Sequence, residues 1–282
     1  MKLFKGLQQA LHPYRDYKFK DFKKAWVRRL KLPAYRGTAY SCPVCGVGLK
    51  CFKPIFKSFL RKLKQYGFVY PVSSFETLNL AAYSCPSCDA SDRDRLYAVY
   101  LERRFEALDR SKVYKFVDFA PSLPLSCKLR KYPFLIYRSA DLYRKTADDR
   151  VDITGMTIYP DASVDFFLCS HILEHIPDDQ KAMRELYRIL KPGGFGIIMV
   201  PIITGLKDTH EDPSITTPEQ RWKYFGQDDH VREYSREGKN GFVPRLKHAG
   251  FTVYLHGVEH FGIEKFKKHG IAENSVLYVV EK

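Results

Sequence analysis

The sequence predicts an α/β protein whose main domain is a mostly parallel β-sheet with helices on both faces. Three observations lead to this prediction. Strand and helix patterns alternate from residue 113 to the last residues, and such alternation is typical of a parallel sheet. Two Cys-x-x-Cys pairs come before this region, and the positive charge of the chain gathers in its first 70 residues. A small N-terminal zinc-binding module and basic amphipathic helices are therefore expected to precede the sheet.

The elements of the main domain can be placed one by one. A helical pattern follows Ser91, and a second helix from Asp179 to Leu190 is expected to stop at the sequence Lys191-Pro-Gly-Gly. In sheets of this kind, ligands bind at the carboxyl ends of the strands. Strands are expected at residues 113–118, 135–140, 164–169, 195–200, 252–256 and 276–281.

The composition is that of an ordinary globular protein. Apolar residues make up 45% and charged residues 28% of the 282, which argues against disorder, collagen-like repeats and a disulfide scaffold. No stretch approaches the ~20 apolar residues that cross a bilayer, and the first residues lack the features of a signal peptide. We therefore expect a cytoplasmic protein, with peripheral attachment to the inner face of the membrane as an accompanying hypothesis.

The charge is distributed unevenly along the chain. The formal net charge is +15, and residues 1–70 contain 17 basic and 2 acidic residues, whereas residues 71–282 contain 30 of each. This asymmetry predicts parts with different tasks. We divide the chain into a basic helical segment (1–40), a zinc-binding module with an inserted basic helix (41–90) and a main domain (91–282).

Two basic amphipathic helices are expected in the N-terminal part, because apolar residues recur there at intervals of three and four among lysines and arginines. The apolar stripe of the first helix, between residues 17 and 32, consists of Phe19, Phe22, Trp26 and Leu30. The stripe of the second, after Pro54, consists of Ile55, Phe56, Phe59, Leu60 and Leu63.

Three interpretations of these helices compete. The stripes can pack on the protein's own core and leave the lysines in solvent. The helices can adsorb to an anionic membrane surface, or they can bind the phosphates of a nucleic acid. Aromatic residues at helical spacing favour the membrane over the nucleic acid slightly, because single-strand binders more usually display aromatics on a sheet or in a groove.

The cysteine pairs predict a metal site. Each pair places two sulfurs on a short turn, and two such turns can surround one ion tetrahedrally. A complete set of four thiolates leaves no open coordination position, so the ion, Zn²⁺, is expected to be structural. Cys51 is a nearby competitor. The four predicted ligands are Cys42, Cys45, Cys85 and Cys88.

Polar residues follow four of the expected strands, where a ligand crevice would lie. Taken singly, each is more simply explained as a turn or helix-capping residue, but four at one edge of a sheet indicate a binding site. Asp141 lies about 20 residues beyond the first strand end, where an acid commonly binds ribose hydroxyls. The four groups are Asp118-Phe119-Ala120-Pro121, Asp141, Asp152-Ile153 and Cys169-Ser170-His171.

Two segments resemble a known enzyme family. The run from Asp161 to Ile202, DASVDFFLCSHILEHIPDDQKAMRELYRILKPGGFGIIMVPI, resembles the region from motif IV to motif V of class I S-adenosylmethionine (SAM)-dependent methyltransferases of the type 11 group. The segment from Glu211 to Ser235, EDPSITTPEQRWKYFGQDDHVREYS, resembles a bacterial branch of that group. Members of this branch also carry a CPxC...CPxC segment before the domain, so the resemblance covers roughly residues 40–282.

The resemblance implies a Rossmann-like seven-stranded sheet, mostly parallel with an antiparallel last strand, and SAM lying across its first, second and fourth strand ends. The loop Asp118–Pro121 would lie beside the methionine part of SAM and Asp141 would hold the ribose. Asp152 and Ile153 would contact the adenine, and Cys169–His171 would line the sulfonium side. The chain departs from the usual pattern at Phe119-Ala120-Pro121-Ser122, where most relatives have a glycine-rich loop.

Histidines are the candidates for the general base that an oxygen or carbon nucleophile needs. His171 and His175 are four residues apart and so share one face of the turn or helix after the fourth strand. His230 lies in a polar insertion after the fifth strand. We predict His230 as the base, with His175 as the second candidate.

The insertion, around residues 204–235, is interpreted as a substrate lid. Its polar side chains can recognise an anionic or polyhydroxyl acceptor, with arginines suited to a carboxylate or phosphate. The competing interpretation is that they only hold the lid together as ion pairs. The predicted substrate-binding residues are Glu211, Asp212, Arg221, Gln227 and Arg232.

The acceptor is predicted from what the loop after the fourth strand contains. Cys169-Ser170-His171-Ile172 stands where enzymes that methylate exocyclic amines usually have an Asn- or Asp-Pro-Pro-Tyr loop. We therefore expect O-methylation of a polar small molecule or a glycan, lipid-linked at the membrane surface in one version of the hypothesis. RNA methylation is the alternative, and a zinc-stabilised binding module without enzymatic activity is a third. The oligomeric state is left open.

Overall fold

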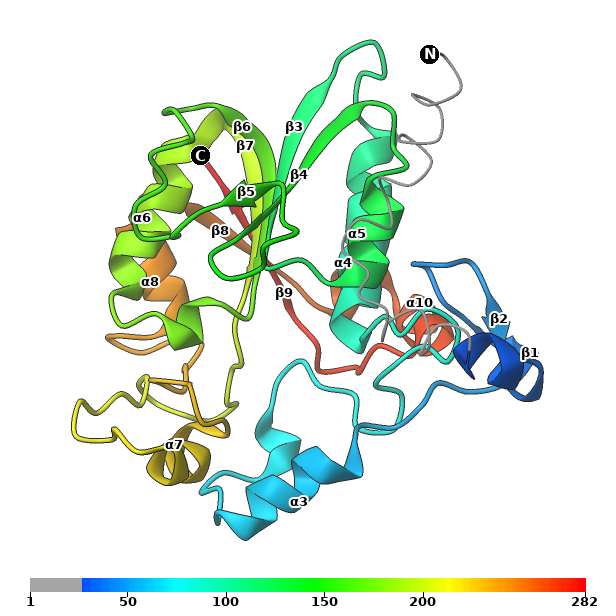
Figure 1. The fold of residues 1–282 in the computed structure, drawn as a ribbon, viewed down its shortest axis with the longest axis horizontal. Helices are drawn as coiled ribbons and strands as arrows, with labels where there is room; N and C mark the ends of the chain where they lie inside the picture. Colours follow the sequence, from blue (N-terminus) through cyan, green and yellow to red (C-terminus); the bar gives the residue numbers. More distant parts are fainter. Residues whose placement is uncertain (1–26) are drawn as a thin grey trace.

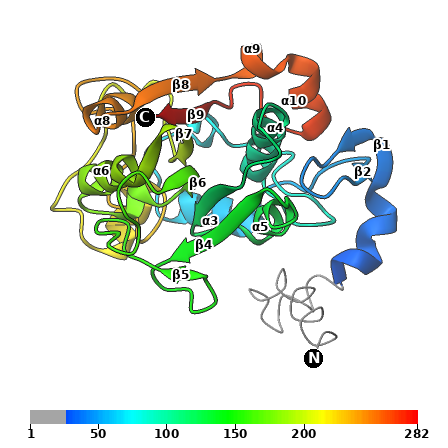
Figure 2. The same cartoon turned by 90° about the horizontal axis from the view of Figure 1, so that it is seen from above.

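The computed structural model describes residues 27–282, and seven of its strands form one sheet (Figures 1 and 2). The strand order is β5-β4-β3-β6-β7-β9-β8. The neighbours from β5 to β7 pair in parallel, whereas β9 is antiparallel to both β7 and β8. This is the predicted Rossmann-like sheet with an antiparallel last strand. Its strands are β3 (Tyr114–Phe119), β4 (Leu135–Asp141), β5 (Asp149–Arg150), β6 (Val164–Ser170), β7 (Leu190–Met199), β8 (Thr252–His256) and β9 (Leu277–Glu281).

Helices cover both faces of this sheet. In Figure 1, α4 and α5 lie on one side of the strands, and α6 and α8 lie on the other. Helix α4 begins at the predicted Ser91, whose side chain accepts a hydrogen bond from the Asp94 amide. The helices of the main domain are α4 (Asp92–Glu106), α5 (Leu123–Leu129), α6 (Asp179–Ile189), α7 (Pro218–Phe225), α8 (Phe242–His248), α9 (Val258–Phe261) and α10 (Ile263–His269), with the short 3-10 turn η4 (Leu173–His175).

Strand β7 departs from the prediction at its start. The prediction has a loop between Lys191 and Gly194, whereas in the structure the strand begins at Leu190, directly after α6. Leu190 is buried opposite Val164 of β6, and the register then shifts before Phe195. Gly193, at φ 76°, lies in this irregular stretch. The Pro-Gly-Gly sequence therefore ends the helix, as expected. It also forms the bulged start of β7, because the burial of Leu190 keeps this segment in the sheet.

The N-terminal module packs tightly on the main domain. Its elements are η2 (Leu32–Tyr35), a hairpin of β1 (Arg36–Ser41) and β2 (Gly48–Leu49), α3 (Lys57–Gln65) and η3 (Val72–Ser74). The guanidinium of Arg95 on α4 is buried beneath the module and donates hydrogen bonds to the Tyr83 and Ala90 carbonyls and to the Gly270 carbonyl after α10. A buried charge with this many acceptors joins the two parts into one unit.

Of the two predicted basic helices, only the second lies wholly within the described residues. Most of the first, including Phe19, Phe22 and Trp26, lies outside the described residues, and Leu30 is exposed. The second is α3, which lies with α7 beyond the carboxyl edge of the sheet (Figure 1). Leu63 is buried and Phe59 contacts Trp222 of α7. For α3, the apolar stripe thus packs mainly on the protein itself, apart from the exposed Phe56.

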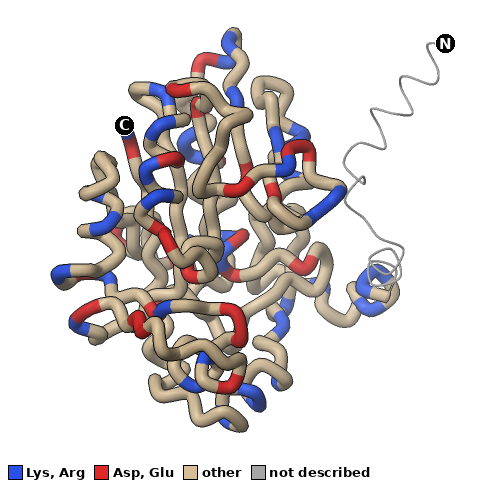
Figure 3. The backbone as a smooth tube through the Cα atoms, turned by 60° about the vertical axis from the view of Figure 1, so that its left-hand side comes forward, with Lys and Arg blue, Asp and Glu red and all other residues tan. Residues whose placement is uncertain are grey.

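The basic face of α3 is open to solvent, because its lysines and its arginine are exposed. Over the main domain, basic and acidic residues are intermingled along the chain (Figure 3). Within residues 27–282, none of the helices is both long enough and apolar enough to span a bilayer.

Candidate active site and zinc site

The four predicted cysteines meet at one point. Their sulfurs all lie within 4.8 Å of one another, with Cys42 Sγ 3.7 Å from Cys88 Sγ and Cys45 Sγ 3.9 Å from Cys85 Sγ. A tetrahedron with zinc–sulfur bonds of about 2.3 Å has sulfurs about 3.8 Å apart. The thiols therefore fit the spacing that a zinc ion requires.

Matching turns hold these cysteines. The Gly46 amide donates to the Cys42 carbonyl at 2.8 Å and the Asp89 amide donates to the Cys85 carbonyl at 2.9 Å. Gly46 and Asp89 both have positive φ, 76° and 72°. The two knuckles are thus alike in backbone conformation, and Cys51 is exposed and not part of the cluster.

A cavity of about 360 Å³ opens at the carboxyl ends of β3 and β6, where the sequence predicts the SAM site. Asp118, Phe119 and Ala120 line it from β3, and Ser170 and His171 line it from β6. Its other wall comes from the start of α4 and the segment before it, with Tyr83, Ser91, Arg93, Asp94 and Tyr97. Its size falls within the usual range for small-ligand sites.

The backbone at this cavity turns sharply. Ala120 has φ 47°, in the left-handed region that favours glycine. It occupies the loop in which most of the enzymes that the sequence resembles have glycines, so the chain adopts a glycine-like turn without a glycine. His171, at φ 55°, makes a similar turn after β6.

Asp118 is the buried acid of this cavity. Its side chain is fully buried, the Tyr137 hydroxyl donates to its Oδ2 at 2.7 Å, and its Oδ1 has no hydrogen-bond partner among the described residues. Burial raises the pKa of Asp118 from 3.8 to about 7. An unpartnered carboxylate oxygen here fits a ligand that donates hydrogen bonds or carries positive charge.

The remaining predicted SAM contacts lie along the same edge. Asp141 ends β4 and accepts hydrogen bonds at Oδ1 from the Tyr143 and Arg144 amides, both at 2.8 Å. Asp152 follows β5 and caps its own turn at Thr154, while Ile153 is buried. Cys169 is buried in β6, and burial raises the pKa of its thiol. Pro121 follows Ala120 but does not line the cavity.

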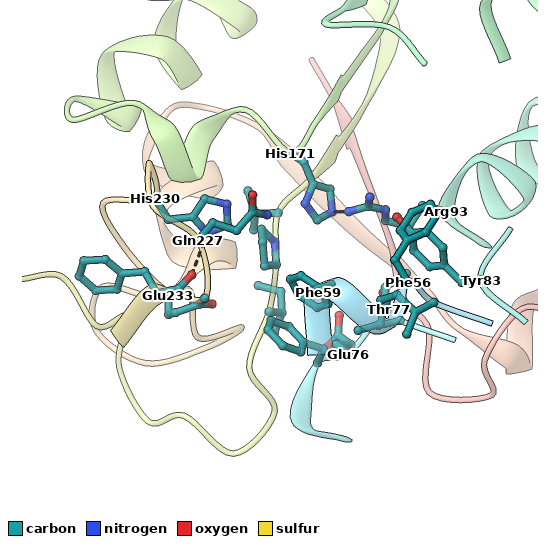
Figure 4. A pocket seen from close by; sticks show the side chains of 18 residues that line it. Phe56, Phe59, Glu76, Thr77, Tyr83, Arg93, His171, Gln227, His230 and Glu233 are labelled. Carbon is teal, nitrogen blue, oxygen red and sulfur yellow. Dashed lines mark hydrogen bonds between the residues drawn. The ribbon is translucent and has the colours of Figure 1, made fainter. Parts of the chain in front are cut away.

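A second cavity, of about 200 Å³, lies between the sheet edge, the N-terminal module and the lid (Figure 4). Its lining combines apolar side chains with polar groups from the module, the start of α4, the end of β6 and the lid. It shares Tyr83, Arg93 and His171 with the first cavity. Its lining residues include Ile55, Phe56, Phe59, Phe75, Glu76, Thr77, Ile202, Phe225, Gln227, His230 and Glu233.

His171 stands between the two cavities. Its Nε2 is hydrogen-bonded to the Arg93 guanidinium (Figure 4), and its Nδ1 lies 3.1 Å from Oε1 of the buried Glu174. Burial, reinforced by the charge of Arg93, lowers the pKa of His171 to about 4. The imidazole is therefore neutral at pH 7.

The two predicted bases lie together. The rings of His175 and His230 are 4.7 Å apart and nearly perpendicular. His230 is buried, its Nδ1 is 2.9 Å from the Phe225 carbonyl, and burial lowers its pKa. Of the two, His230 lines the second cavity.

The lid residues separate into two places. Gln227 lines the second cavity, whereas Glu211, Asp212, Arg221 and Arg232 line a groove on the outer side of the lid, near α8. Arg232 is buried and binds Glu211 at 2.8 Å and the carbonyls of Leu173, Ile176 and Pro177. These contacts of Arg232 are the ones expected if the charged residues hold the lid together, which is the interpretation that competes with substrate binding.

The sequence analysis missed the parts of the cavity walls that come from the N-terminal module, the start of α4 and the end of the lid. Tyr83 of the module, Arg93 and Tyr97 of α4, and Glu233 of the lid were not among the predicted site residues. The Tyr97 hydroxyl lies 2.8 Å from the Ser170 hydroxyl. The capping sequence Ser91-x-x-Asp94 marks a helix start but carries no signal that this helix start faces the sheet edge.

Comparisons with known proteins support a methyltransferase. Residues 139–198, from β4 to β7, match the family model described as "Methyltransferase domain". This match supports SAM-dependent methyl transfer and names no acceptor. A search of curated proteins finds no match to the chain.

Several solved structures have a similar arrangement. A SAM-dependent methyltransferase from Mesorhizobium loti is 13% identical at a TM-score of 0.40, over 65% of this chain and 98% of that one. One from Archaeoglobus fulgidus is 12% identical at a TM-score of 0.41, over 69% and 96%. The [4+2]-cyclase SpnF is 13% identical at a TM-score of 0.47, over 79% and 90%.

Proposed function

We propose that this protein transfers a methyl group from SAM to a hydroxyl group of an acceptor held in the 200 Å³ cavity. In this reaction a carbon–oxygen bond forms as the carbon–sulfur bond breaks, S-adenosylhomocysteine leaves, and the hydroxyl proton passes to a base. The observation that carries the proposal is the meeting of two cavities at Tyr83, Arg93 and His171. A donor site and an acceptor site that touch at one wall suit an in-line displacement.

The residues of the first cavity fit SAM, whose sulfonium supplies an electrophilic methyl group. The free Oδ1 of Asp118 can accept hydrogen bonds from the ammonium of the methionine part. Asp141, at the end of the neighbouring β4, can accept hydrogen bonds from the ribose hydroxyls at its Oδ2, which lies 3.9 Å from Arg144 Nε. Cys169, Ser170 and His171 would border the sulfonium, where the neutral imidazole of His171 avoids repulsion of a cation.

The lining of the second cavity supports an acceptor with an apolar face and several hydroxyls. Aromatic side chains such as Phe56 and Phe59 can pack on the faces of a sugar ring, and Glu76, Gln227 and Glu233 can bind its hydroxyls. A cavity of about 200 Å³ suits a ring-sized group at the end of a larger molecule. This favours a polar small molecule or a glycan.

His230 is the group we assign to the acceptor's proton, with His175 as the second candidate. Donation from Nδ1 to the Phe225 carbonyl leaves the lone pair of His230 on Nε2, which is buried and unpartnered. A neutral histidine with a free lone pair at a cavity wall can accept a proton.

The exposed basic face of α3 favours an acceptor that carries phosphate. Lys57, Arg61, Lys62 and Lys64 face solvent on a helix whose other side lines the cavity. A lipid-linked glycan at an anionic membrane would present such a charge, and RNA is the second candidate for the same reason.

Calorimetry and methyl transfer test the proposal. The purified, zinc-loaded protein is expected to bind SAM, and Asp141→Ala is expected to weaken binding at least about tenfold, while Glu273→Ala, an exposed change elsewhere, leaves it unaltered. A folded protein that does not bind SAM would refute the proposal and favour the binding module.

The acceptor class and the base have tests of their own. Binding to anionic liposomes and binding to RNA are each measured at two salt concentrations. Retention on liposomes without RNA affinity would support the lipid-linked glycan, and RNA affinity without retention on liposomes would support RNA. Single-turnover methyl transfer by His230→Ala and His175→Ala tests the base, because an unimpaired His230 variant removes that residue from the chemistry.

A further inference from the structure

Behind the acceptor cavity, three potential metal ligands converge on one point. Glu174 and His175 come from η4, and His230 comes from the lid. One ligand atom of each lies within 4.8 Å of the others. This cluster is separate from the cysteines and has a different chemistry, with two imidazoles and one carboxylate in place of four thiolates.

Two of the three ligands are buried and each keeps an atom without a hydrogen-bond partner. Glu174 is fully buried, and its Oε2 has no hydrogen-bond partner. Its Oε1 lies 3.1 Å from His171 Nδ1, which carries the ring proton because Arg93 donates to Nε2. His230 is 2% exposed, and its Nε2 is likewise unpartnered. Buried polar atoms without partners are rare and call for an explanation.

The histidines are held as metal ligands usually are. A metal-bound histidine typically donates its second ring nitrogen to a carbonyl or a carboxylate, which fixes the ring and its tautomer. His230 Nδ1 is 2.9 Å from the Phe225 carbonyl, and His175 Nδ1 is 3.3 Å from Asp229 Oδ2. Both arrangements leave Nε2 as the nitrogen available to an ion.

The surroundings contain a further buried carboxyl group. Glu233 lies beside His230 on the cavity wall (Figure 4), is 1% exposed, and neither of its oxygens has a hydrogen bond. The buried Arg232 on the same lid segment donates to backbone carbonyls and Glu211 rather than to Glu174. Among the described residues, no lysine or arginine forms an ion pair with Glu174 or Glu233.

We propose that Glu174, His175 and His230 bind a divalent transition-metal ion. Two imidazoles and one carboxylate form a set that suits Zn²⁺ or Fe²⁺, and three protein ligands leave coordination positions open. Of the three ligands, His230 lines the acceptor cavity, and we place the open positions on that side. A hydroxyl bound there would lose its proton more readily, so the ion would take over the task assigned to the His230 lone pair in the metal-free protein.

Metal binding tests this directly, with no dependence on methyl transfer. The full-length protein, stripped of metal and reconstituted with Co²⁺, is expected to bind two ions per chain. One gives the intense sulfur-to-metal charge-transfer absorption of a thiolate site, and the other gives only the weak bands of nitrogen and oxygen ligands. Glu174→Gln, which keeps the side-chain shape, is expected to lose the second ion and retain the first, while Cys85→Ser loses the first.

Asp229, which contacts His175 but is not one of the proposed ligands, allows a test with a smaller expected effect on metal affinity. Asp229→Asn removes the carboxylate behind His175 and is expected to weaken the second site about tenfold, whereas the adjacent exposed Asp228→Asn leaves its affinity unchanged. His230→Ala is likewise expected to lose the second ion. Circular dichroism checks that each variant is folded, and if His230→Ala is not, His175→Ala, at a partly exposed residue, takes its place in the test. A folded protein that binds a single Co²⁺, or a Glu174→Gln variant that still binds two, would overturn the proposal.

Discussion

Replacing Asp118 by Asn is expected to change how stability depends on pH. Asp118 is fully buried, and burial raises its pKa from 3.8 to about 7. The folded protein therefore holds this proton more tightly than the unfolded chain does. As pH rises from the unfolded pKa to the folded one, the free energy of unfolding falls, because the unfolded carboxyl ionises without the cost of burial.

The magnitude follows from the two pKa values. A difference of about 3 units corresponds to about 4 kcal/mol when Asp118 is fully ionised in both states, and about half of this loss is complete by pH 5.5. Between pH 5.5 and pH 8.5, the wild-type protein should therefore lose about 2 kcal/mol relative to Asp118→Asn, which has no proton to lose. The Tyr137 hydroxyl can still donate to the amide oxygen of the asparagine.

Urea unfolding of both proteins at pH 5.5 and pH 8.5 measures this difference. Other titrating groups cancel because they are common to the two proteins, and the exposed Asp228→Asn serves as a matched control. A stability difference between wild type and Asp118→Asn that is the same at both pH values would refute the reasoning. If the ammonium of SAM binds at Asp118, wild-type affinity for SAM is also expected to rise over this pH range, as calorimetry would detect.

Three further changes have defined outcomes. Cys85→Ser is expected to lose the zinc ion of the cysteine cluster, about one per chain by elemental analysis, whereas Cys51→Ser keeps it; equal zinc contents would contradict the site. Arg232→Ala should cost about 3 to 5 kcal/mol in urea unfolding because it removes a buried, paired charge, against less than about 0.5 kcal/mol for the exposed Lys239→Ala; a similar cost for both would show that Arg232 is not structural. Ser91→Ala should cost about 1 kcal/mol by removing the cap of α4, and an unchanged unfolding midpoint would argue against the cap.

The sheet was largely predictable because its strands carry local patterns. Buried strands such as β3 and β6 appear as short apolar runs that end in polar residues, and the structure places them within one or two residues of the prediction. The start of β7 was not predictable, since Pro-Gly-Gly locally signals a loop. Only the pairing of Leu190 with Val164 makes that segment a strand.

The candidate site was predictable where its residues follow strands and not where it is assembled from distant segments. Asp118, Ser170 and His171 follow strand ends, so their meeting at one edge is a property of any parallel sheet. Tyr83 reaches the same cavity because Arg95 holds the N-terminal module on the main domain. No periodicity in the chain records that contact.

By itself, the sequence determined the order of the strands along the chain, the four cysteines and the resemblance to methyltransferases, because spacing and alternation are local properties. The tertiary structure alone decided that the buried Glu174 lies beside His230 from the lid, and that Arg232 contacts Glu211 and backbone carbonyls and does not line the 200 Å³ cavity. The reason is physical: what a charged side chain does depends on the partners that burial leaves to it, and those partners come from residues far away in the chain.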